Sequence, residues 1–180
     1  MNPCSLKFDR LLSNCLYELM KWIKAAVVGA LGSLVMFLLI MFGIHGAGVA
    51  PFNLPPSAAF LETLGLNVGP LPALAHFGYG AFWSIVLVAL YGSRTSLMKG
   101  LGLATGLWLL MMLVHSPIIG WGFFGFGGSG HQLAASDPLY LGSPIKYVVA
   151  TLVLHLIYGS ILGGLNPAWI ELKHSEHATA

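Results

Sequence analysis

Charged residues are scarce in this sequence and are missing from four long stretches of it. Lys, Arg, Asp and Glu make up 8% of the 180 residues, while hydrophobic residues make up 57%. A soluble domain averages about a quarter charged residues. None of the four charged types occurs within 25–61, 63–93, 100–136 or 147–170. Each stretch can hold the roughly 20 apolar residues with which a helix crosses a bilayer, so the composition predicts a membrane protein.

The apolar stretches also lack the alternation of apolar and polar residues that the strands of a membrane barrel require. The predicted fold is therefore all-α: an integral membrane four-helix bundle in a single domain, residues 1–180. Residues 10–24 place apolar and polar side chains on opposite helical faces, which is typical of a short amphipathic interfacial helix before the first span. The expected membrane spans are 25–46, 71–92, 97–119 and 145–166.

Basic residues lie almost entirely on one side of these predicted spans, which predicts the orientation of the chain. By the positive-inside rule both termini are cytoplasmic, in the inner (plasma) membrane of a cell. Cys4 and Cys15 then lie in a reducing compartment, so no disulfide is expected. The sequence offers no basic face for nucleic acid. The basic residues on the expected inner side are Lys7, Arg10, Lys21, Lys24, Arg94, Lys99 and Lys173, against Lys146 alone on the outer side.

Two stretches in the second and fourth spans resemble each other and indicate an internal duplication. In HFGYGAFW (76–83) and HLIYGSIL (155–162), His76 matches His155 and Tyr79 matches Tyr158. Arg94 follows His76 by eighteen residues, and Lys173 follows His155 by the same number. At 1.5 Å per residue both histidines lie about 27 Å from the basic end, in the outer half of the membrane. The first and third spans align likewise, 30–45 on 100–115, which pairs His45 with His115. The sequence thus predicts two parallel-repeat helical hairpins about a pseudo-two-fold axis.

Histidine is costly inside a membrane and marks a candidate site there. His45, His76, His115 and His155 come from four different spans, and no Asp or Glu lies at a comparable depth within the spans. Neutral imidazole is a ligand for heme iron, copper or zinc. We therefore expect a His/Tyr-lined intramembrane site that binds heme b or a transition metal (copper, zinc or iron), for electron transfer or ligand binding. Its expected cofactor-binding residues are His76, His155, His115, His45, Tyr79 and Tyr158, with His76, His155 and His115 as metal ligands.

Two other functions fit the same histidines. A transporter or channel for protons or a small solute could use them as a polar path, although such proteins usually use buried carboxylates. In a structural or accessory subunit of a membrane complex they would hydrogen-bond neighbouring groups and hold the hairpins in register. No catalytic residues are predicted, and a non-enzymatic role is favoured. Expected partners are the lipid bilayer and either further copies of this chain or a larger membrane complex.

The second half of the chain resembles a known family. HSPIIG (115–120), followed about forty residues after His115 by HLIYG (155–159), resembles the YagU-like bacterial inner-membrane proteins. Those proteins also place one histidine before a Pro-containing end of one span and another inside the next. The resemblance covers roughly 100–163. It implies a helical fold in a bacterial inner membrane, and it implies no catalytic residues.

Overall fold

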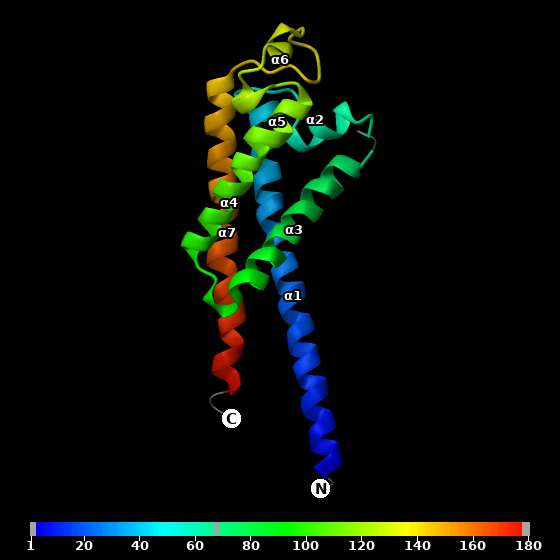
Figure 1. Ribbon diagram of the computed structural model, residues 1–180, viewed down its shortest axis with the longest axis vertical. Helices are drawn as coiled ribbons and strands as arrows, with labels where there is room; N and C mark the ends of the chain where they lie inside the picture. The colour runs from blue at the N-terminus through cyan, green and yellow to red at the C-terminus, as the bar shows by residue number, and fades with distance from the viewer. Residues whose placement is uncertain (1–2, 67–68, 178–180) are drawn as a thin grey trace.

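The structure, a computed structural model, contains four long apolar helices. It describes residues 3–66 and 69–177, with the side chains of 12–66 and 69–169. Within these ranges the chain is helical and forms no β-strand, as the composition predicts. Four helical stretches are long and apolar enough to cross a membrane. The first and the last long helix point their terminal ends to the same end of the molecule (Figure 1).

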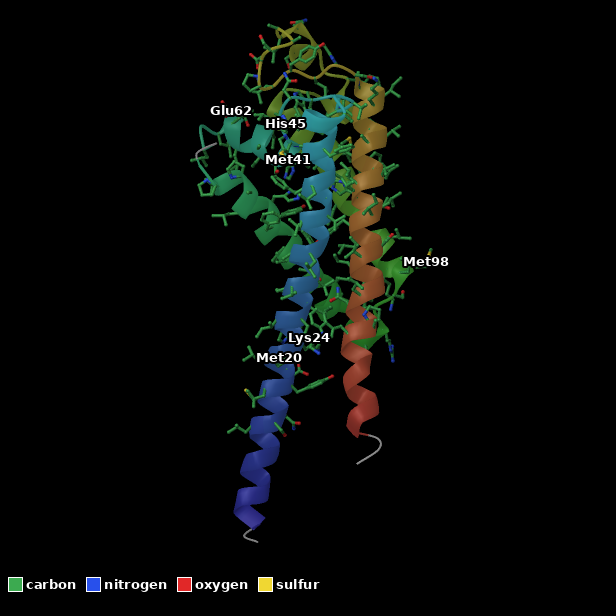
Figure 2. The ribbon with its side chains drawn as sticks, turned by 180° about the vertical axis from the view of Figure 1, so that it is seen from behind. Met20, Lys24, Met41, His45, Glu62 and Met98 are labelled. Carbon is green, nitrogen blue, oxygen red and sulfur yellow. The ribbon has the colours of Figure 1, made fainter. Side chains whose placement is uncertain are left out.

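The first long helix, α1 (Pro3–Met41), is continuous over 39 residues. This differs from the expected separate interfacial helix at 10–24, because the chain does not turn before the first span. Residues 10–28 contain neither Pro nor Gly, so nothing in the sequence interrupts the backbone hydrogen bonds there. Figure 2 shows Met20 and Lys24 on the lower half of this single helix. A wider π-helical turn, η1 (Phe42–Gly46), ends it.

Prolines and glycines set the bounds of the next two helices. The short helix α2 (Pro56–Thr63) starts with proline at its first position, where the missing N–H has no helical partner to lose. The second long helix, α3 (Leu71–Tyr91), follows Pro70 and ends at Gly92, whose φ of 54° favours glycine. A single 3-10 turn, η2 (Gly92–Arg94), then leads toward the third long helix.

The third long apolar stretch has a π-helical turn near the end away from the termini. It consists of α4 (Leu97–Leu110), the turn η3 (Met111–His115) and α5 (Ser116–Ile119). Pro117 explains the turn, because proline has no N–H and its ring would press on the carbonyl group four residues earlier. The wider turn keeps the helix running past this residue. Gly120, with φ of 92°, ends the span.

The last long helix, α7 (Pro144–His177), begins one residue before the predicted span of 145–166 and extends further than expected. The sequence analysis ended the span near residue 166, in front of Pro167. The helix instead passes through Pro167. The residues after it, such as Ala168, Glu171 and Leu172, have high helix propensity, so the helix resumes beyond the missing hydrogen bond.

The two connections at the end away from the termini fold together over the bundle. The second connection carries the turn η4 (Phe123–Gly125) and the short helix α6 (Gly128–Gln132). The Asn53 side-chain amide donates hydrogen bonds to the carbonyl oxygens of Ala135 and Asp137, both at 2.8 Å. Below them, the Phe52 and Trp121 rings stack with their centroids 6.2 Å apart. These contacts tie the first connection to the second.

The long helices pack as two pairs, α1 with α3 and α4 with α7, and α1 also packs along α7. In contrast, α3 and α4 barely touch beyond the turn that joins them. Large apolar side chains cover the outside of the bundle, among them Leu38, Leu90 and Met98, which are 58%, 67% and 76% exposed. Met98 projects away from the helices in Figure 2. Because such a surface is suited to lipid rather than water, the fold indicates a membrane protein.

Glycines allow both helix pairs to approach closely. A Cβ atom on Gly29 of α1 would lie 2.6 Å from Cβ of Ser84 and would overlap the Gly80 carbonyl oxygen on α3. A Cβ atom on Gly100 of α4 would lie 2.7 Å from the backbone nitrogen of Gly163 on α7. These contacts are typical of close helix packing in membranes. Gly102 and Gly106 also have small-xxx-small spacing, yet neither would meet another atom within 4 Å.

Candidate functional site

A cavity of about 310 Å³ lies between the helices, toward the end away from the two termini. All four long helices line it: α1 through Met36, α3 through His76, the third span through His115, and α7 through His155. The short helix α2 covers it with Phe60. Its wall is mainly apolar, and no Lys, Arg, Asp or Glu is among the described residues that line it. A cavity of this size and character is typical of a small-molecule site.

The structure brings together five of the six residues that the sequence analysis proposed for a site. The exception is His45, which is exposed and lies on η1 at the outer end of α1, outside the cavity lining (Figure 2). The sequence placed His45 at the depth of His115, and depth alone does not decide which way a side chain faces. The proposed residues that line the cavity are His76, Tyr79, His115, His155 and Tyr158.

His155 is the most deeply buried of the histidines whose side chains the structure describes, at 7% exposure. Its Nδ1 lies 2.8 Å from the carbonyl oxygen of Thr151, one helical turn earlier on α7. A carbonyl oxygen can only accept, so Nδ1 carries the proton and donates it. In the neutral ring Nε2 then has a free lone pair, and Nε2 makes no hydrogen bond to the described part of the chain. A backbone carbonyl that fixes the tautomer in this way is typical of histidines that bind a metal or a ligand.

His76 is held in a similar way, but across two helices. Its Nε2 lies 3.1 Å from the carbonyl oxygen of Ser33 on α1, so Nε2 is the protonated nitrogen and Nδ1 has the lone pair. The Phe37 ring packs against it at 5.9 Å between centroids. The two histidines line the same cavity from different helices and give it two of its polar groups.

Tyr158 forms part of the cavity wall below these histidines. Its hydroxyl group donates to the carbonyl oxygen of Gly80 on α3 at 2.6 Å. Its sequence counterpart Tyr79 is 42% exposed. The matching tyrosines therefore play different parts, one as a buried interhelical contact and one at the open edge of the site.

The structure gives no direct support for the predicted metal ligands His76, His155 and His115. In the part of the chain with described side chains, no group of three or more His, Cys, Asp or Glu residues is arranged to hold a metal ion. His115 packs against the Phe60 ring instead, with 5.0 Å between centroids. Cys15 is a free thiol on the exposed part of α1, and the Cys4 side chain lies outside the described residues. A heme iron needs only one or two protein ligands and is not tested by this geometry.

Several lining residues were missed by the sequence analysis. Thr151 and Ser33 fix the histidine tautomers through their backbone carbonyls, and α2 contributes Phe60 to the cavity wall. The spacing of Thr151, four residues before His155, was a usable signal because such residues are neighbours on a helix. The consecutive prolines Pro55 and Pro56 were a signal for the start of α2. The approach of Ser33 to His76 had no local signal.

Comparison of the chain with protein-family models, with curated proteins and with solved structures gives no match. The resemblance to the YagU-like proteins stays a prediction.

Proposed function

We propose that this protein binds a small, uncharged, lipid-soluble ligand in the cavity between its four long helices, with His155 and His76 as the main polar contacts. The observation that carries the proposal is the lone pair of His155 Nε2, fixed by the bond from Nδ1 to Thr151, in a cavity with no charged side chain in its described lining. A charged ligand would be buried there without a counter-ion, which is costly.

The route for such a ligand is lateral, between α3 and α4. These helices are joined by η2 and diverge from there toward the outer end (Figure 1). The cavity is lined by α3 through Ala75 and Tyr79, which are both exposed, and by the third span through Met111 and His115. A lipid-soluble molecule reaches this opening from the bilayer without crossing water.

Heme b is the second candidate, and the fixed tautomer of His155 favours it. An imidazole whose Nδ1 donates to a carbonyl group presents Nε2 to iron. Met36 and Met111 also line the cavity, and a thioether is the second axial ligand in some cytochromes. The missing feature is a partner for the heme propionates, because no Lys or Arg is among the described lining residues. An uncharged ligand therefore fits better than heme or a single copper, zinc or iron ion.

The experiment is to purify the full chain in mild detergent and analyse what it carries. Organic extraction with mass spectrometry detects a lipid-soluble ligand, while an absorption spectrum with and without dithionite, plus metal analysis, detects heme or a metal. The expected result is a co-purifying neutral compound that is lost in His155→Ala and kept in His45→Ala, since His45 lies outside the cavity. A Soret band that shifts on reduction would replace this proposal with heme binding.

A protein without any bound molecule, and with no saturable uptake of lipid extracts, would overturn the proposal. Two further measurements then distinguish transport from a structural role in a membrane complex. A transporter loses solute or proton flux in His155→Ala while staying folded. A structural histidine instead loses thermal stability in His155→Ala and recovers it in His155→Gln, because the amide replaces the hydrogen bond.

The internal duplication and the orientation are also proposals. The duplication is supported by the equivalent crossings of Gly29 with Gly80 and of Gly100 with Gly159. The inward position of the termini is supported by Lys24, which lies over the Trp169 ring at 5.4 Å, and by Lys21, which lies over Trp22 at 4.8 Å. Lysine with tryptophan at one end of a bundle is typical of a membrane interface, and the lysines favour the cytoplasmic side.

A further inference from the structure

His76, His155 and three of the hydroxyl groups that line the cavity donate their protons to backbone carbonyl groups, and this restricts the ligand. His76 Nε2–H donates to the Ser33 carbonyl and His155 Nδ1–H donates to the Thr151 carbonyl, at 3.1 and 2.8 Å. What each neutral ring then offers the cavity is a lone pair. Both of these imidazoles line the cavity and are thus hydrogen-bond acceptors.

Three hydroxyl groups in the cavity wall also donate their protons to backbone carbonyl groups. Tyr158 donates to the Gly80 carbonyl at 2.6 Å, Ser33 to the Gly29 carbonyl at 2.9 Å, and Thr151 to the Tyr147 carbonyl at 2.6 Å. Each oxygen keeps acceptor capacity, although that of Thr151 already receives the Trp108 indole N–H at 3.2 Å. A ligand that only accepts hydrogen bonds would place its own lone pairs against these lone pairs, which is unfavourable. A ligand with hydrogen-bond donors can instead donate to these acceptors.

Aromatic side chains around the same space indicate the shape of the ligand. Phe60 and His115 pack with their rings tilted by 32° on one side of the cavity, and Phe52 and Tyr79 also line it. Flat rings pack favourably against such faces and edges. The cavity therefore suits a planar ring better than a branched or flexible head group.

We infer that the ligand is an aromatic ring that carries two hydroxyl groups and an apolar tail, the chemical class of reduced lipid quinones. The hydroxyls donate to His155 Nε2 and His76 Nδ1, the ring packs against Phe60, and the tail leaves between α3 and α4 into the bilayer. This inference rests on the proposed function, and it concerns recognition alone.

The test is a ligand series on the wild-type full-length protein in detergent, under anaerobic conditions. The probes are decyl-1,4-hydroquinone, the corresponding oxidised quinone, its 1,4-dimethyl ether, and 1-O-decylglycerol, with binding measured by equilibrium dialysis. The hydroquinone should bind about tenfold or more tightly than the quinone or the ether, because both lack the two donors. The glycerol ether, a diol without a ring, should also bind more weakly.

Two variants then test which residue is responsible for the preference for hydroquinone. His155→Ala should reduce hydroquinone affinity to that of the quinone, and His45→Ala should leave the whole series unchanged. If His155→Ala does not fold, His76→Ala is measured instead. The comparison of the four probes on the wild-type protein tests the inference even without either variant.

The outcomes separate the inference from the proposed function. Equal affinity for hydroquinone, quinone and ether, or preference for the quinone, would overturn donor recognition while leaving a lipid-ligand site in place. Equal binding of 1-O-decylglycerol would overturn selection of an aromatic ring. If none of the four probes binds, the inference is wrong; if the purified protein also carries no neutral compound, the proposed function is wrong with it.

Discussion

The hydroxyl group of Tyr158 donates a hydrogen bond of 2.6 Å to the carbonyl oxygen of Gly80 and so joins α7 to α3. These helices belong to different packed pairs, and the bond joins them in the wall of the cavity, which both residues line. Gly80 also meets α1, where it faces Ser33 and Gly29. Three long helices are therefore held together at one point, and Tyr158 is only 4% exposed there.

Replacing Tyr158 with Phe should destabilise the protein by about 1 kcal/mol, because the buried bond to Gly80 is lost while the ring remains. In a chain of this length this corresponds to a fall in Tm of about 3 °C, measurable by thermal unfolding in detergent. Tyr79→Phe is the matched control, since Tyr79 is 42% exposed and its hydroxyl is not at a helix crossing. Equal effects of the two substitutions would contradict the role given to Tyr158.

Gly100→Ala should destabilise the pair of α4 and α7. The new Cβ would overlap the Gly159 carbonyl oxygen and lie 2.7 Å from the Gly163 nitrogen, and backbone atoms cannot move aside without separating the helices. Overpacking of this kind costs about 1–3 kcal/mol. This loss of stability is measured by thermal unfolding.

Gly102→Ala is the control for that substitution, because it lies on the same helix and meets nothing within 4 Å. It should be neutral or stabilise by up to about 1 kcal/mol, since alanine favours the helix over glycine. If Gly102→Ala proves as harmful as Gly100→Ala, α4 faces its neighbours differently from this structure.

Ala75→Phe should fill part of the cavity and compete with the ligand. Ala75 lines the cavity at its open side, so a phenyl group has space there and should leave Tm close to that of the wild type. Ligand occupancy after purification, measured by extraction, should fall at least about tenfold. Leu74→Phe is the control because Leu74 is 62% exposed and lies outside the lining. Unchanged occupancy in Ala75→Phe would place the ligand elsewhere.

The orientation is testable with the exposed thiol of Cys15. In a Cys4→Ser background, a membrane-impermeant maleimide should leave Cys15 unlabelled on intact cells and label it after permeabilisation, because the basic residues place the N-terminus inside. A cysteine introduced as Ser136→Cys, at an exposed position of the opposite end, should be labelled on intact cells. The reverse pattern would invert the topology.

The four spans were predictable because the sequence itself excludes charge from them, and helices in lipid satisfy their backbone groups locally. Two helix bounds differ from the prediction, because a local sequence signal was taken as the end of a helix. A change from amphipathic to apolar residues near residue 24 does not break a helix that contains no Pro or Gly there. Pro167 does not end α7.

The candidate site was predictable only in part. The repeated histidine and tyrosine led to His76, His155, Tyr79 and Tyr158, and all four line the cavity. The alignment that paired His45 with His115 did not predict that only His115 lines the cavity. The glycine contacts make Gly29 the structural equivalent of Gly100, and this differs by one residue from that alignment. One residue turns a helix by about 100°. Such a turn separates a cavity-facing position from an exposed one.

The sequence by itself determined that the chain is helical, that it contains four apolar helices long enough to cross a membrane, and that the histidines within those helices lie toward one end. These properties depend on composition and on the fixed rise per residue of a helix. Only the tertiary structure decided which side chains face one another, because rotation and crossing depend on the fit between helices, as at Gly29 with Gly80. It also decided which nitrogen of His76 and His155 holds the proton, since that depends on the carbonyl group each ring reaches. The chemistry offered to a ligand follows from those contacts.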